Sequence, residues 1–133
     1  MKLTDVDERA VTRFLPGDVL AILALVLVGT VQHGTLNPQH YAGVLLPFLV
    51  GWLAAAPLVG AYSSRAAESS RAALLLAAGT WLLGDLVGQL LRNTSLFPGN
   101  ADPTFFLVMF LVGALLLSVV RFGSLVVADL VGN

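Results

Sequence analysis

The stretch VLAILALVLVGTVQHGTLNPQHYAGVLLPFLVGWLAAAPLVGAYSS, residues 19–64, decides the fold because it contains no Asp, Glu, Lys or Arg. A helix that spans a bilayer needs about 20 mostly apolar residues, so this stretch has room for two spans and a turn. The turn lies at residues 33–38, where Asn37 can cap a helix and Pro38 suits its first position. The sequence therefore predicts a helical hairpin within a membrane.

The same signature recurs in the second half of the chain. Asp102-Pro103 repeats the cap-then-proline pattern, and the apolar stretch before the connection at 93–102 is interrupted only by Asp85. Short connections favour antiparallel neighbours, so we expect an all-α, integral membrane four-helix up-down bundle. Its helices are predicted over residues 17–33, 38–62, 71–92 and 103–121 or beyond.

The composition excludes several classes of protein. Of the 133 residues, 57% are hydrophobic and 11% are charged, whereas soluble domains average about 45–50% and about 25%. The net charge of −1 gives no basic surface for nucleic acid, and the absence of Cys excludes disulfides and thiolate metal sites. The sequence contains no Gly-x-Ser-x-Gly, P-loop or His-Glu-x-x-His motif. We therefore expect neither an enzyme nor a bound cofactor or metal.

Residues 1–15 differ from the rest of the chain. Acidic residues follow Thr4, as in the first turn of a helix. Apolar residues then recur at helical spacing, at Val6, Ala10, Val11 and Phe14. We predict a short amphipathic helix that lies at the membrane interface, with a frayed tail as the alternative. Residues 16–133 then form a single domain of four transmembrane helices.

The basic residues predict the orientation of the chain. In the four-helix arrangement only Arg92 lies on one side of the membrane, and the other six lie on the opposite side: Lys2, Arg9, Arg13, Arg65, Arg71 and Arg121. Lys and Arg are enriched in cytoplasmic segments. We therefore expect a multi-pass protein of the plasma membrane with both termini in the cytoplasm and the connections at 34–37 and 93–102 outside.

The two halves of the sequence are candidate copies of one helical hairpin. Val28-Gly29 matches Val87-Gly88 at an offset of 59 residues, and residues 48–50 match residues 106–108 at an offset of 58. Two copies with the same orientation would be related by a pseudo-twofold axis along the membrane normal. Chance matches between apolar helices are the alternative.

Polar residues near the outer ends of the predicted spans form a candidate site. Trp81, Asp85, Gln89 and Arg92 recur at the spacing of one helix face. Ionisable residues within a membrane indicate function by default, because burying them costs free energy. Asp85 is interpreted either as a proton or cation site, with Arg92 or His33 as its partner, or as a structural acid. Gln32 and His33 end the first span on the same side, where His33 either titrates or caps its helix.

Two further sets of residues bear on packing. Gly84 and Gly88 form a small-xxx-small pair next to the Trp81 face, so another helix can approach closely there. Asp18 opens the first span and Arg121 closes the fourth, at the same predicted depth. They are either an ion pair at the cytoplasmic end or two separate residues, each stabilised by its own helix dipole.

The sequence resembles a known family over roughly residues 14–122. The motifs that carry the resemblance are Gly17-Asp18, Gly29-x-x-x-His33-Gly34, Pro47-Phe48, Gly51-Trp52, Trp81, Gly88, Leu91-Arg92 and Arg121. The family comprises small four-helix membrane proteins of unknown function from halophilic archaea and actinobacteria. The resemblance implies a fold and a location but no activity. At Thr30 this chain departs from relatives that often carry Arg.

Three functions remain open at this point. The first is a small oligomeric transporter or channel that uses the outer polar residues, and the second is an accessory subunit that packs against a larger membrane complex. The third is a protein that binds a lipid, quinone or carotenoid in a groove lined by Trp52, Trp81 and Phe105 or Phe106. The expected partners are the lipid bilayer and either further copies of the chain or another membrane protein.

Overall fold

The structure, a computed structural model, describes residues 5–34, 37–97 and 102–132. The elements in chain order are α1 (Glu8–Gln32), α2 (Pro38–Val59), α3 (Ser64–Glu68), α4 (Ser70–Arg92) and α5 (Pro103–Leu130). The described residues contain no strand, which confirms the all-α prediction. Four of the helices are long and apolar enough to span a membrane.

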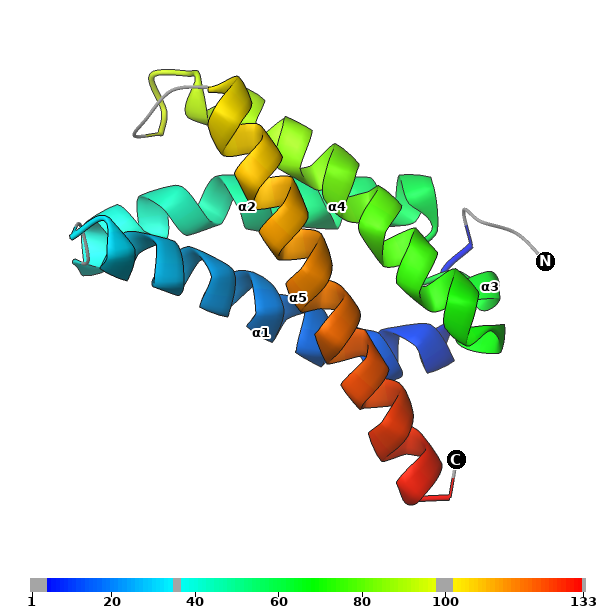
Figure 1. Cartoon of the computed structure of the whole chain (residues 1–133). Helices are drawn as coiled ribbons and strands as arrows, with labels where there is room; N and C mark the ends of the chain where they lie inside the picture. Colours follow the sequence, from blue (N-terminus) through cyan, green and yellow to red (C-terminus); the bar gives the residue numbers. More distant parts are fainter. Residues whose placement is uncertain (1–4, 35–36, 98–101, 133) are drawn as a thin grey trace.

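The four long helices form an up-down bundle. α1 packs against α2 and α5, and α4 packs against the same two helices. Figure 1 shows the end of α1 and the start of α2 on the left, and the end of α4 and the start of α5 at the upper left. We call this the outer end of the bundle. The opposite, inner end carries the short helix α3, the start of α1 and the end of α5 (Figure 1).

The predicted helix starts at the outer end are confirmed. The Asn37 side chain accepts a hydrogen bond from the backbone N–H of His40 at 2.8 Å, and Pro38 occupies the first turn of α2. The Asp102 carboxylate accepts the N–H of Thr104 at 2.8 Å. In both cases a side-chain oxygen satisfies a backbone donor that has no partner within the helix.

The inner ends of the helices differ from the prediction. α2 ends at Val59 rather than near residue 62, because Gly60 takes a left-handed conformation with φ of 102° and its N–H donates to the Ala56 carbonyl. The connection that follows contains α3, which was not predicted. The Ser63 hydroxyl caps that helix, and the Ser69 hydroxyl caps α4.

The predicted boundary between an interfacial segment over 1–15 and a span over 17–33 is wrong. α1 is continuous from Glu8 through Pro16, which lies on the exposed face and removes one backbone hydrogen bond without ending the helix. Ala10 and Phe14 are fully buried in the core. These apolar side chains hold the segment against the bundle, so it extends the first helix; residues 1–4 lie outside the described part.

The packing has the character expected of a protein surrounded by lipid. The core contains bulky aromatic side chains, with Trp52, Trp81 and Phe48 fully buried. The outward face of α5 carries a row of exposed apolar side chains, among them Leu107, Leu111, Leu115, Val119 and Phe122. In water such a row would favour aggregation, whereas in a bilayer it contacts lipid chains.

Glycines bring α2 and α4 into backbone contact. A Cβ atom added at Gly51 of α2 would overlap the carbonyl oxygen of Gly84, and one added at Gly88 would overlap the Phe48 ring. Small residues allow such close approach between membrane helices. Gly84 and Gly88 therefore form a packing surface, and α2 is the helix that they admit.

Trp81 makes the corresponding contact with α5. Its indole lies over Gly113, where any added Cβ would overlap the ring nitrogen. The indole N–H donates to the Met109 carbonyl at 2.9 Å. α4 thus contacts one neighbour through glycines and the other through Trp81, so it is central to the packing.

The arrangement of contacts is compatible with two hairpins related by a pseudo-twofold axis. Such an axis would interchange the α1–α2 and α4–α5 pairs, and the α1–α5 and α2–α4 pairs, and all four pairs pack together. The environments of the matched glycines differ, however. A Cβ atom at Gly88 would meet Phe48, whereas one at Gly29 would have no atom within 4 Å. The repeat therefore stays a prediction, and any symmetry does not extend to these side-chain contacts.

Candidate functional site

A buried ion pair lies at the inner end of the bundle. Arg121 of α5 donates to both carboxylate oxygens of Asp18 on α1, through Nε at 3.0 Å and Nη2 at 2.8 Å. Both side chains are fully buried. Of the two interpretations of these residues, the structure therefore has the ion pair. A bidentate arginine–carboxylate pair is among the stronger charged contacts.

The remaining donors of Arg121 join this pair to two more elements. Nη1 donates to the Ala73 carbonyl of α4 at 2.8 Å, and Nη2 donates to the Ala61 carbonyl after α2 at 3.1 Å. The Phe14 ring lies 4.5 Å from the guanidinium carbon, within the range of a cation–π contact. One side chain thus connects the inner ends of all four long helices.

Tyr62 completes this inner cluster. Its hydroxyl donates to Asp18 Oδ2 at 2.7 Å and accepts the indole N–H of Trp52 at 2.9 Å. Burial, with the nearby Asp18 carboxylate, raises the pKa of the Tyr62 phenol, so the hydroxyl keeps its proton and remains a donor. The left-handed turn at Gly60 directs Tyr62 into the bundle, where its hydroxyl joins Asp18 to Trp52.

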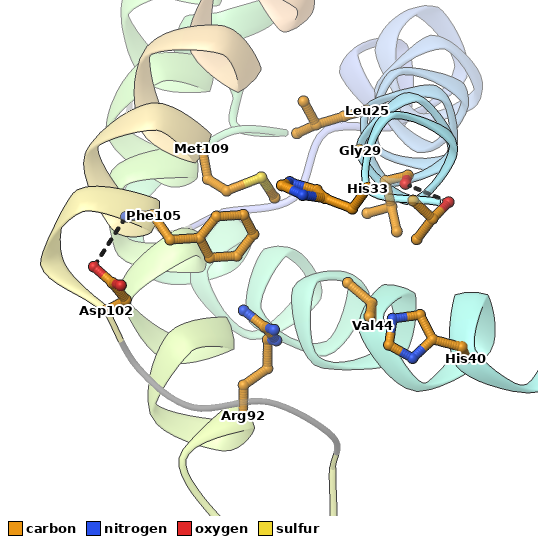
Figure 2. Close-up of a pocket in the computed structure, with 11 residues that line it drawn as sticks. Leu25, Gly29, His33, His40, Val44, Arg92, Asp102, Phe105 and Met109 are labelled. Carbon is orange, nitrogen blue, oxygen red and sulfur yellow. Dashed lines mark hydrogen bonds between the residues drawn. The ribbon is translucent and has the colours of Figure 1, made fainter. Parts of the chain in front are cut away.

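A pocket of about 330 Å³ lies at the outer end, between the two hairpins. All four long helices contribute to it, together with the residue that caps α5. The lining residues are Leu25, Val26, Gly29, Thr30, His33, His40, Val44, Arg92, Asp102, Phe105 and Met109 (Figure 2). The pocket walls are mostly apolar.

Arg92 is the distinctive group of this pocket. Its side chain enters the space between the hairpins (Figure 2), and its guanidinium carbon lies 4.8 Å from the Phe105 ring centroid. Nε and Nη1 are buried and have no hydrogen-bond partner in the described part of the chain. A buried charged donor without a partner is costly, so this guanidinium is suited to an anion that enters the pocket.

Asp85 and Gln89 lie deeper on the same helix. Both are buried, and Gln89 Nε2 donates to Asp85 Oδ1 at 3.3 Å. On α4 they lie between Trp81, which reaches Met109, and Arg92, which reaches Phe105. Since Phe105 and Met109 line the pocket, this pair lies behind the pocket wall.

The structure divides the predicted outer site into three parts. Arg92 and His33 line the pocket, whereas Asp85 and Gln89 form a separate buried pair. Gln32 is exposed and belongs to neither group. The described residues contain no group of three or more His, Asp or Glu side chains that could hold a metal ion.

The predicted lipophile groove is wrong in most of its residues. Trp52 and Trp81 are fully buried, and their indole nitrogens already donate within the protein. Phe106 does not line the pocket, and of the four aromatics only Phe105 does. Sequence reasoning did not place Thr30, Asp102 and Met109 at a site. The cap-then-proline pattern marks Asp102 only as a helix start, and Met109 has no local signal beyond helical spacing.

These features define a class: a four-helix membrane-type bundle that is closed at its inner end by a buried ion-pair cluster and hollowed at its outer end. The chain belongs to the family described as protein of unknown function (DUF3054), whose model matches residues 15–124. This confirms the expected uncharacterised family and leaves its expected source organisms untested. Comparison with curated proteins and with solved structures found no match.

Proposed function

We propose that this protein is a small membrane carrier that binds an organic anion in its outer pocket. The observation that supports this proposal is the half-buried Arg92 side chain at the pocket, whose Nε and Nη1 atoms are buried and free of partners in the described residues. A carboxylate can accept hydrogen bonds from such a guanidinium in a geometry that a neutral group cannot match.

The shape of the bundle favours a carrier over a channel. The outer pocket does not continue through one copy, because Trp52, Trp81 and Phe48 fill the middle. The cluster around Arg121 closes the inner end with hydrogen bonds that join α5 to α1, to α4 and to the segment after α2. A site open at one end and closed at the other corresponds to one state of an alternating-access cycle.

The pocket lining indicates the chemical class of the substrate. Its volume of about 330 Å³ lies at the lower end of the usual range for small-molecule sites, about 300–1,000 Å³. Leu25, Val26 and Met109 form apolar walls, and Arg92 supplies the cation. A monocarboxylate with a short apolar body fits this combination better than a sugar or a polyanion.

Binding of such an anion should depend on Arg92. In lipid nanodiscs, Arg92→Gln should weaken the binding of a medium-chain monocarboxylate about 10- to 100-fold, because a hydrogen bond to a charged group contributes about 1.5–3 kcal/mol. Isothermal titration would measure this, with the primary amide of the same chain length as an uncharged probe. Equal binding of acid and amide to the wild type would contradict the proposal.

A second variant separates loss of the site from loss of the fold. Gly29 lines the pocket and has no atom within 4 Å of an added Cβ, so Gly29→Leu should fill the pocket without disturbing the helices. Gly123 on α5 has equally open surroundings outside this pocket, so Gly123→Leu is the matched control. We expect the first variant to abolish carboxylate binding and the second to retain it.

The orientation and location of the chain also belong to this proposal. We propose that the inner end faces the cytoplasm across the plasma membrane, because five of the six basic residues in the described part of the chain lie toward that end. The chain has no Cys, so single cysteines at exposed Glu68 and Ser95 report the two sides. An impermeant maleimide should label Ser95→Cys in intact cells and Glu68→Cys only after permeabilisation; the reverse pattern would invert the orientation.

A second candidate function is that of an accessory subunit, which packs against a different membrane protein. The exposed apolar row of α5 favours it, because Gly123 leaves that surface open to a close neighbour. Native mass spectrometry from nanodiscs discriminates the candidates. A different protein bound in fixed ratio would favour the accessory role, whereas copies of this chain alone would favour the carrier.

A further inference from the structure

Asp85 is a buried acid with no cation paired to it. It is fully buried, and its one hydrogen bond is the 3.3 Å contact from the Gln89 amide. The ion pairs in the described residues are Asp7–Arg9 and Asp18–Arg121, both at the inner end. Asp85 Oδ2 and Gln89 Oε1 are buried without any partner. Each of the two side chains therefore has one buried acceptor oxygen without a donor.

No charged group on the surrounding helices serves as a partner for Asp85. α4 packs against α2, α3 and α5. The titratable and charged residues of these elements, of α4 itself and of the α5 cap are His40, Tyr41, Arg65, Glu68, Arg71, Arg92, Asp102, Arg121 and Asp129. None of them forms an ion pair or hydrogen bond with Asp85. Arg92 lies seven residues along α4, about 10 Å at 1.5 Å per residue, and enters the pocket instead (Figure 2).

The contrast with Asp18 shows what an ionised carboxylate requires in this bundle. Asp18 accepts two hydrogen bonds from Arg121 and one from Tyr62. Asp85 has one long contact from a neutral amide. A negative charge without a counter-ion within an apolar bundle is disfavoured, whereas a protonated carboxyl needs only one acceptor.

A single proton on Asp85 removes the unpaired negative charge and provides a donor for the Gln89 carbonyl oxygen. The orientation of a glutamine amide is assigned rather than observed, so the Gln89 carbonyl can turn toward Asp85 and accept a hydrogen bond from a carboxylic acid O–H. A metal cation is a poorer solution, since hard cations take about six or more oxygens. The unpaired oxygens here are Asp85 Oδ2, Gln89 Oε1 and, on an adjoining face of α4, Thr80 Oγ1.

We infer that Asp85 is a proton-binding site whose proton crosses the membrane together with the anion held by Arg92. The coupling rests on the proposed carrier function, whereas the bound proton does not. One proton on Asp85 and one monoanion on Arg92 add no net charge to the bundle. The proton enters from the outer pocket past Gln89, which lies one helical turn from each of the two residues, and leaves to the opposite side when the inner cluster opens.

The bound proton is tested first, without any substrate. Infrared difference spectra of the wild type in nanodiscs should contain the carbonyl stretch of a buried, protonated carboxyl group at neutral pH. Asp85→Asn should lose that band, and Asp129→Asn, at an exposed acid, should keep it. Absence of the band from the wild type would overturn the inference. Loss of the band when Na⁺ is added at constant pH would also overturn it, because Na⁺ would then take the place of the proton.

The coupling is tested in proteoliposomes with a radiolabelled medium-chain monocarboxylate. An inward proton gradient should drive at least tenfold accumulation by the wild type, and Asp85→Asn should abolish this accumulation while retaining carboxylate binding and exchange at equal pH. Uptake that ignores the gradient would overturn the coupling and leave the carrier intact. A protonated Asp85 in a protein that neither binds nor moves carboxylates would instead overturn the proposed function.

Discussion

Arg121→Gln is expected to destabilise the protein by about 3–5 kcal/mol, the range for removing one partner of a buried ion pair. The variant leaves the Asp18 carboxylate fully buried with Tyr62 as its remaining donor. It also removes the donors to the carbonyls of Ala61 and Ala73. Four elements lose their common contact, so we expect the inner end to open and the protein to unfold at lower temperature in mild detergent.

The measurement is thermal or denaturant unfolding of the purified protein, with two comparisons. Arg9→Gln removes the exposed ion pair with Asp7 and should leave the transition unchanged, because exposed pairs contribute little. The double variant Asp18→Asn/Arg121→Gln should be more stable than Arg121→Gln alone, since it leaves no unpaired charge. A single variant as stable as the wild type would show that the cluster does not hold the inner end closed.

The number of long helices and the positions of their outer ends could be predicted because local chemistry decides them. Asn37 and Asp102 each precede a proline, and this cap-then-proline pattern begins a helix whatever surrounds it. The start of α1 could not be predicted this way. The polar residues before Phe14 resemble an interfacial segment. Tertiary contacts make that segment part of the bundle, among them the contact of Phe14 with Arg121 and the hydrogen bond from the Asp7 N–H to the Tyr62 carbonyl.

The candidate site was predictable along one helix but not between helices. Spacing alone places Trp81, Asp85 and Arg92 on one face of α4. It does not reveal that α5 meets this face at Met109 and Phe105, so that Arg92 enters a pocket and Asp85 lies behind its wall. Position in the sequence was equally uninformative for Tyr62, because the left-handed Gly60 reverses the chain beneath the bundle.

Alanine substitution is expected to have opposite effects on stability at two glycines, Gly29 of α1 and Gly51 in the α2–α4 contact. In a helix interior Ala is more favourable than Gly by about 1 kcal/mol, so an alanine substitution stabilises wherever space allows. Gly29 meets that condition, since an added Cβ has no atom within 4 Å. Gly51 does not, because its Cβ would overlap the backbone carbonyl of Gly84 and approach the Gly88 nitrogen to 3.2 Å.

Gly51→Ala should therefore destabilise the protein by about 3 kcal/mol, the upper part of the range for overpacking a close-packed core. A backbone carbonyl cannot rotate away as a side chain can, so α2 and α4 must separate along their length. The shift would also disturb Trp52, whose backbone nitrogen lies 3.2 Å from a Cβ built on Gly84. Unfolding of Gly51→Ala beside Gly29→Ala measures the difference. If both substitutions stabilise the protein, the α2–α4 contact is looser than the structure has it, and α4 is free to move against α2.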